Sequence, residues 1–76
     1  MAETTYTLTG PGGIEVFRNL PDGTTVTLTD GSVGTVVANP GDGAFVAVNF
    51  IEHPDTTKVG EEEFVFFNQV VSAVGE

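Results

Sequence analysis

The chain has 76 residues, no cysteine, and 11 acidic residues against two basic ones, which gives a net charge of −9 at pH 7. A chain of this length forms a single domain, and without cysteine it has neither disulfides nor thiolate metal sites to stabilise a small core. Nucleic acids and anionic membranes both require cationic side chains on their partners, so the charge excludes both classes of partner.

The start of the chain lacks the basic segment and following apolar run that are typical of a signal peptide. The longest uncharged apolar stretch, Ala44–Ile51, is too short to span a bilayer. We therefore expect a soluble protein of the cytoplasm, or of a virion if the source is viral.

The first twenty residues contain one alternating segment and one short apolar run. Thr4–Thr9 alternates apolar residues with threonines, which predicts a half-buried strand. The glycines and proline of Gly10–Gly13 end this strand, and Ile14–Phe17 then predicts either a second short strand or an irregular segment. We interpret residues 1–20 as an N-terminal strand or arm that precedes a barrel formed by residues 21–76, within one domain overall.

Three further strands are separated by glycine turns. Thr24–Thr29 alternates valine and leucine with threonine, and the Asp30-Gly31 dipeptide that follows is a strong hairpin signal. Val33–Ala38 is the second strand of this hairpin, and Gly34 within it predicts a bulge or a bend. Ala44–Ile51 is largely apolar on both alternating faces, which predicts a central strand covered on both sides.

The C-terminal part has a less regular pattern. Glu61–Phe64 predicts a short 3₁₀ turn, and Phe66–Val71 predicts the last strand. Ser72–Glu76 is expected to fray. Together the segments predict an all-β fold: a small antiparallel barrel of about five strands with an additional N-terminal strand.

Three stretches carry a resemblance to known proteins. The segments Val26–Val37, with its Gly-Thr-Val-Val sequence, Phe45–Phe50 and Glu61–Phe64 resemble the small SH3-like barrels, a group that includes the photosystem I subunit of the PsaE type and the KOW-like modules. The resemblance implies an SH3-like barrel and a non-catalytic module that docks on larger assemblies. The chain departs from RNA-binding KOW modules because it lacks their basic residues.

Residue types that usually perform catalysis are nearly absent. His53 is the sole histidine of the chain, and nothing in the sequence places Ser32 or Ser72 beside it as a nucleophile. We therefore predict no catalytic residue. The Gly10–Gly13 segment lacks the third glycine of the Gly-x-Gly-x-x-Gly dinucleotide fingerprint, and it lacks the following helix and the lysine of nucleotide-binding loops. We therefore predict no cofactor.

Acidic side chains offer most of the oxygen ligands for a cation. Glu52, His53 and Asp55 form an incomplete set for a transition metal. Glu61–Glu63 with Asp42 or Asp55 could supply oxygens for Ca²⁺, but the chain has no Asp-x-Asp-x-Asp loop. A solvated acidic face is the simpler interpretation, so we predict no metal site and expect Glu61–Glu63 to meet arginine or lysine of a partner.

Adjacent apolar residues near the end of the chain indicate an interface. Consecutive strand residues point to opposite faces, so one of Phe66 and Phe67 lies under a second layer or at the surface. The same argument applies to Val70 and Val71, whereas the other phenylalanines are assigned to core packing. The threonine-rich strands carry few charges, so their edges are open to pairing with another chain. The predicted partner-binding residues are Tyr6, Leu8, Glu61, Glu62, Glu63, Phe66, Phe67, Val70 and Val71.

These features favour a non-enzymatic structural or accessory protein that binds another protein, or copies of itself, within a larger assembly. An accessory or decoration subunit of a virion or other shell fits this small, cysteine-free, sheet-rich chain by type. Two alternatives stay open: an adaptor or regulatory subunit of a cytoplasmic or photosynthetic enzyme complex, and a barrel that binds a cation or a small ligand. The acidity predicts a partner with a basic surface.

Overall fold

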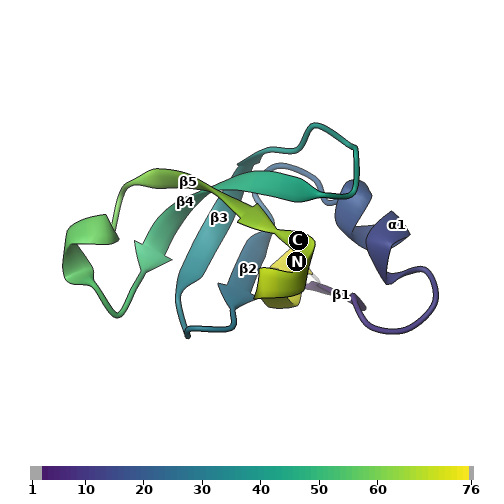
Figure 1. The fold of residues 1–76 in the computed structure, drawn as a ribbon, viewed down its shortest axis with the longest axis horizontal. Coiled ribbons are helices and arrows are strands. Elements are labelled where there is room, and N and C mark those ends of the chain that lie inside the picture. Colours follow the sequence, from purple (N-terminus) through teal and green to yellow (C-terminus); the bar gives the residue numbers. More distant parts are fainter. Residues whose placement is uncertain (1–2, 76) are drawn as a thin grey trace.

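The computed structural model describes residues 3–75, which form six strands, one short helix and two 3₁₀ turns. All strand pairs are antiparallel and belong to one sheet with the order β1-β6-β2-β3-β4-β5 (Figure 1). The elements are β1 (Thr4–Tyr6), α1 (Gly13–Arg18), β2 (Thr25–Leu28), β3 (Val33–Ala38), β4 (Phe45–Glu52), η1 (Thr56–Lys58), β5 (Glu62–Phe66), η2 (Phe67–Gln69) and β6 (Val70–Gly75). The predicted all-β class is confirmed, and the additional N-terminal strand is present but spans Thr4–Tyr6 rather than the expected Thr4–Thr9.

The short link between β5 and β6 forces the sheet to curl. These strands lie four strand spacings apart in the sheet order, which is about 19 Å in a flat sheet. The chain from Phe66 to Val70 reaches at most about 14 Å. The sheet therefore rolls toward a barrel, as its bent strands show in Figure 1. The roll is not completed: among residues 3–75, β1 pairs with β6 alone and β5 with β4 alone, so the predicted barrel is an open one.

The β2–β3 hairpin follows the pattern expected from its alternating residues. Val26 and Leu28 are buried, while Thr25 and Thr27, which alternate with them, are half-exposed. The register between β3 and β4 shifts at Val33/Gly34, which confirms the bulge expected at this glycine. The alternation of apolar and threonine residues is therefore sufficient to define which face of this hairpin is covered.

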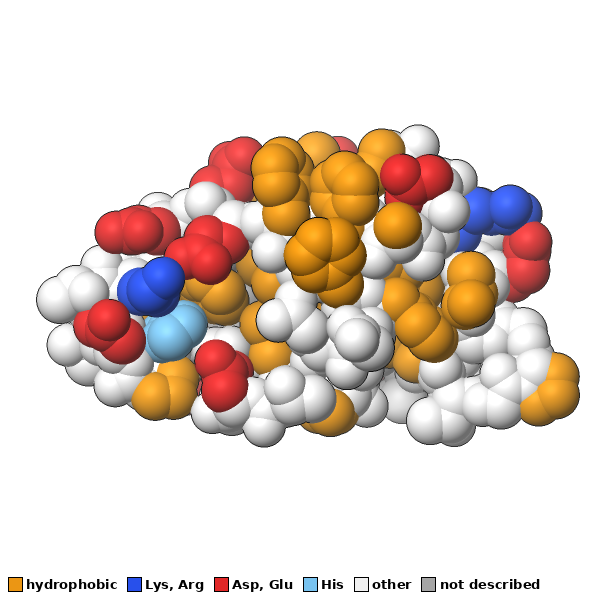
Figure 2. All heavy atoms as spheres, viewed as in Figure 1, with side chains coloured by type: hydrophobic (Ala, Val, Ile, Leu, Met, Phe, Trp, Pro, Cys, Tyr) orange, Lys and Arg blue, Asp and Glu red, His pale blue; other side chains and the backbone are white. Residues whose placement is uncertain are grey.

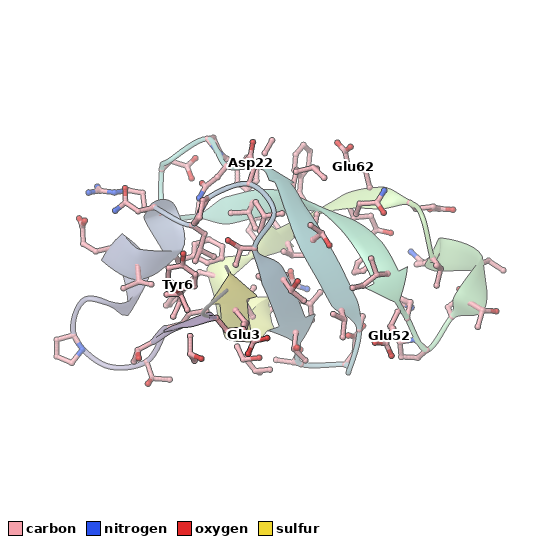
Figure 3. The ribbon with its side chains drawn as sticks, turned by 180° about the vertical axis from the view of Figure 1, so that it is seen from behind. Glu3, Tyr6, Asp22, Glu52 and Glu62 are labelled. Carbon is pink, nitrogen blue, oxygen red and sulfur yellow. The ribbon has the colours of Figure 1, made fainter. Side chains whose placement is uncertain are left out.

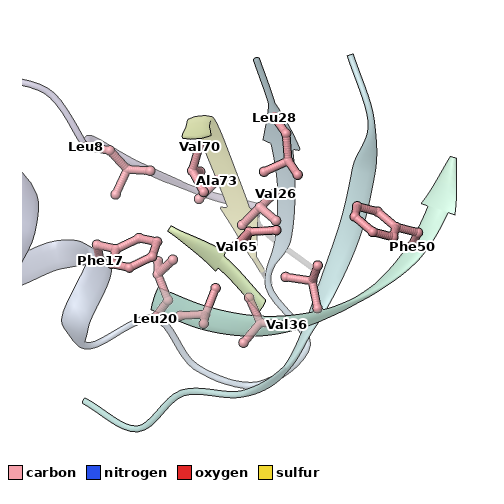
Figure 4. Close-up of a cluster of buried hydrophobic side chains, with 12 residues drawn as sticks. Leu8, Phe17, Leu20, Val26, Leu28, Val36, Phe50, Val65, Val70 and Ala73 are labelled. Carbon is pink, nitrogen blue, oxygen red and sulfur yellow. The ribbon is translucent and has the colours of Figure 1, made fainter. Parts of the chain in front are cut away.

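The core lies inside the curl, and residues from before β2 complete it (Figure 4). Phe17 of α1 is fully buried, and its ring meets that of Phe67 edge-on with centroids 5.3 Å apart. The N-terminal segment therefore shares one core with the strands. The buried cluster consists of Leu8, Phe17, Leu20, Val26, Leu28, Val36, Val46, Val48, Phe50, Val65, Val70 and Ala73.

Four expectations at the element level are wrong. The Ile14–Phe17 run is helical and belongs to α1, which buries Phe17 in the core. The segment expected as a 3₁₀ turn, Glu61–Phe64, instead belongs largely to β5. The 3₁₀ turns lie at η1 and η2, so η2 interrupts the strand predicted over Phe66–Val71. Residues 72–75 do not fray, because β6 is held between β1 and β2, whereas residue 76 lies outside the described residues.

Strand β4 is present one residue further along the chain than predicted, over Phe45–Glu52 rather than Ala44–Ile51, and its two faces are not both covered as expected. Val46, Val48 and Phe50 face the core, and Ala47 is also buried. On the outer face, Phe45 and Asn49 are half-exposed and Ile51 is exposed. No second layer lies over this face within the described residues, and the apolar surface there is open to a partner.

Candidate protein-binding surface

Three phenylalanines form an aromatic patch on the outer face of β4 and β5. Phe45 stands opposite Phe66, and Ala47 opposite Phe64, and directly opposed residues of an antiparallel pair share one face. The ring of Phe45 meets Phe64 edge-on at 5.0 Å between centroids and Phe66 at 6.1 Å. We call Phe45, Phe64 and Phe66 the aromatic patch; its rings support one another in edge-to-face contacts typical of protein interiors.

This patch lies in solvent although its chemistry is that of a core. Phe64 is 66% exposed and Phe66 is 53% exposed. On the opposite side of the same two strands, Val46, Val48 and Val65 already fill the core. The exposed rings therefore add nothing to core burial, and such a cluster on a small domain is a candidate interaction surface.

Acidic side chains border the aromatic patch. Glu62 stands opposite Asn49, on the same face of β5 as Phe64 and Phe66, and its side chain points away from the ribbon (Figure 3). Figure 2 shows the clustered hydrophobic side chains with acidic side chains on either side. The surface thus combines apolar area with negative charge, a combination that suits a partner with both apolar and cationic groups.

Both basic residues of the chain are already engaged with glutamates. Lys58 Nζ lies 2.9 Å from Glu63 Oε2, and Arg18 pairs with Glu15 one turn earlier in α1. The hydrogen bond to Glu63 is the main reason that the pKa of Lys58 is raised above its ordinary value. Within residues 3–75, Glu61 and Glu62 form no ion pair, so their charge is available to an external cation.

His53 lies near a serine, but in the wrong order for catalysis. Its Nε2 is 3.9 Å from Asp30 Oδ2, and Asp30 Oδ1 accepts hydrogen bonds from the hydroxyl and the N–H of the buried Ser32. Activation of a serine requires the histidine between serine and carboxylate, whereas here the carboxylate stands between the two. His53 Nδ1 accepts from the Asp55 N–H at 2.9 Å, and the ring packs edge-on against Phe50.

The other sequence candidates have local structural roles. Asp42 accepts a hydrogen bond from the Ala44 N–H, and Asp55 accepts two from Thr57 at the start of η1. Contrary to expectation, Gly10–Gly13 leads into a helix, but this helix, α1, is only six residues long. Among residues 3–75, no group of three His, Cys, Asp or Glu side chains is arranged to hold a metal ion.

The structure separates the predicted partner-binding residues into two groups. Glu62 and Phe66 lie exposed on the face of the aromatic patch, Glu61 is exposed at the position just before β5, and Val71 is exposed on β6. In contrast, Leu8 and Val70 are core residues, and Tyr6 and Phe67 pack against that core. Glu63 forms an ion pair with Lys58. Sequence reasoning missed Phe45 and Phe64, although the alternation Glu62-x-Phe64-x-Phe66 in a strand would have placed these three side chains on one face.

No protein-family model, no curated protein and no solved structure matches the chain. Within the described residues, no helix has the length and apolar character needed to cross a membrane.

Proposed function

We propose that this protein is a non-enzymatic accessory subunit that binds a protein partner through the aromatic patch and its acidic border. The observation that carries the proposal is the exposure of Phe64 and Phe66 beside Phe45, over strands whose other face is already packed. Burying such rings against a partner releases their apolar surface from water, and a few aromatic residues commonly dominate binding energy.

The acidic border of the patch, formed by Glu61 and Glu62, indicates which kind of chemical group the partner presents. Glu61 and Glu62 lack cationic partners within residues 3–75, while the chain as a whole carries −9. Arginine side chains satisfy both features, because they pair with carboxylates and stack on aromatic rings. We therefore propose a partner that presents apolar and basic groups together.

We also propose an SH3-like type for the fold and a shell or virion as the assembly. The curled antiparallel sheet and the Gly-Thr-Val-Val segment support the first proposal. The second proposal is supported by small size and high sheet content, which this chain shares with shell subunits as a class. The alternative, an adaptor of an enzyme complex in the cytoplasm, uses the same surface but a different stoichiometry. Light scattering of the purified complex separates them, since a shell subunit covers a symmetric lattice and an adaptor binds in a small fixed number.

The test is affinity capture from native lysate at low salt with three tagged proteins, followed by mass spectrometry. We expect one dominant protein with the wild type, and its loss with the double variant Phe64→Ser/Phe66→Ser. Val59→Ser is the matched control, because Val59 is 47% exposed but lies outside the patch. All three should have similar melting temperatures. Equal capture by all three, or capture by none, would overturn the proposal.

A further inference from the structure

Strand β5 has an open edge whose hydrogen-bonding groups can be assigned residue by residue. At the two ends of its pairing with β4, the Phe67 N–H donates to the Ala44 carbonyl and the Phe50 N–H donates to the Glu61 carbonyl. Hydrogen-bonded pairs alternate with non-bonded pairs in an antiparallel ladder. Residues 61, 63, 65 and 67 therefore bond to β4, and residues 62, 64 and 66 direct their N–H and C=O groups to the opposite edge.

One of these outward groups is already used. The Phe66 N–H donates to Gln69 Oε1 at 2.9 Å, which agrees with the assigned direction because this N–H does not reach β4. Within residues 3–75 no strand pairs on this side of β5. The backbone groups of Glu62 and Phe64, both exposed residues, thus form a short free edge that ends where the Gln69 side chain covers Phe66.

The free edge and the aromatic patch belong to the same residues. A strand added beside β5 would place alternate side chains on the outer face, next to Phe64 and Phe66, and the others next to Glu61 and Glu63. Apolar side chains suit the first row, and basic side chains suit the positions beside Glu61 and Glu62, whose carboxylates form no ion pair within residues 3–75, whereas Glu63 is already paired with Lys58. An extended segment that alternates apolar and basic residues therefore matches the backbone, the rings and the charge together.

We propose that the partner binds as an added strand: an extended segment with alternating apolar and basic residues pairs with the Glu62–Phe64 edge of β5. This inference rests on the proposed function and names the binding mode of the same surface. A second copy of this chain is the less favoured occupant, because β5-to-β5 pairing would bring two Glu61–Glu63 segments together between molecules of net charge −9.

The probe is a fluorescein-labelled peptide that alternates valine and arginine, titrated by anisotropy and by NMR on ¹⁵N-labelled protein. In the free protein, we expect the amides of Glu62 and Phe64 to exchange fast and those of Glu63 and Val65 to exchange slowly. Peptide binding should slow exchange at Glu62 and Phe64. A peptide that does not bind, or that binds without protecting these two amides, would overturn the proposal.

Two variants should change the affinity in opposite directions. Glu62→Pro removes an outward N–H while leaving the bonds of Glu61 and Glu63 to β4, and it should weaken peptide binding at least about tenfold relative to the charge-matched control Glu62→Gln. Gln69→Ala uncovers the Phe66 N–H and should tighten binding, and it keeps the test valid if the proline variant does not fold. Equal affinities across these variants would contradict the added strand.

The same variants separate this inference from the proposed function. If lysate capture survives Glu62→Pro but is lost with Phe64→Ser/Phe66→Ser, the patch binds the partner and the added strand is wrong. If capture survives both, the proposed function itself fails. A concentration-dependent dimer in sedimentation that Glu62→Pro abolishes would assign the edge to a second copy and overturn the basic segment as occupant.

Discussion

Asp30 and Ser32 form a small polar motif that holds the turn between β2 and β3. The buried Ser32 hydroxyl and N–H both donate to Asp30 Oδ1, and these bonds, the hydroxyl first, lower the pKa of Asp30 below its ordinary value. Thr57 does the same for Asp55 at the start of η1. Each carboxylate therefore binds a proton more weakly in the folded state than in the unfolded state.

This difference predicts a loss of stability in acid. A carboxyl whose folded pKa is depressed stabilises the fold above its unfolded pKa, and the stabilisation disappears as pH falls through the folded pKa. We expect the melting temperature to decrease below about pH 4. Ser32→Ala should lower the melting temperature at pH 7 by roughly 4–8 °C, the equivalent of one hydrogen bond of about 1 kcal/mol in a domain of this size.

The control for the acid prediction is Asp30→Asn, which removes the titrating group but keeps a hydrogen-bond acceptor. Calorimetry between pH 2 and 7 should give a shallower acid decline for this variant than for the wild type. An identical acid decline in both proteins would show that Asp30 does not contribute to it.

At the scale of elements, α1 depends on a close approach between its first residue and the chain before it. A Cβ on Gly13 would stand 2.2 Å from the Leu8 carbonyl oxygen, a backbone atom that cannot rotate away. Gly13→Ala must therefore displace α1, and with it the buried ring of Phe17. We expect a loss of about 2 kcal/mol or more in the free energy of unfolding, measured with urea. Glu15→Ala on the exposed face of α1 is the control and should cost far less.

The same helix shows where sequence patterns stop being informative. Thr25–Leu28 and Phe45–Glu52 were predictable because alternation over several residues fixes both the strand and its buried face. Ile14–Phe17 is too short to distinguish a period of two from one of 3.6, and contacts with the core decide its conformation. The exposure of Phe64 is missed when phenylalanine is assigned to the core by default and Glu61–Phe64 is taken as a 3₁₀ turn, because only a strand places Phe64 on the same face as Glu62. The turn at η1 has a local sequence signal, because an aspartate such as Asp55 commonly accepts a hydrogen bond from the N–H two residues later, here that of Thr57.

At the scale of the whole molecule, unbalanced charge opposes folding. With a net charge of −9 and both basic residues in ion pairs, acidic groups repel one another across a small surface. Added salt screens this repulsion. We expect the melting temperature at pH 7 to rise with sodium chloride concentration.

Glu61→Gln/Glu62→Gln should reduce that rise, because the net charge becomes −9 + 2 = −7 while the Lys58–Glu63 pair is kept. Asn68→Gln, an exposed uncharged substitution, is the control and should keep the full salt dependence. A salt response that does not differ between these two variants would contradict a role for the acidic border in the repulsion.

The position of β6 has a consequence for how the protein is made. β6 lies between β1 and β2 and pairs with both. During synthesis, the edges of β1 and β2 that pair with β6 therefore stay unpaired until residues 70–75 have left the ribosome. Contacts between residues so distant in the chain form slowly, and the waiting strand edges can pair with other nascent chains. A stalled chain that stops before Val70 should therefore remain unfolded and sensitive to protease.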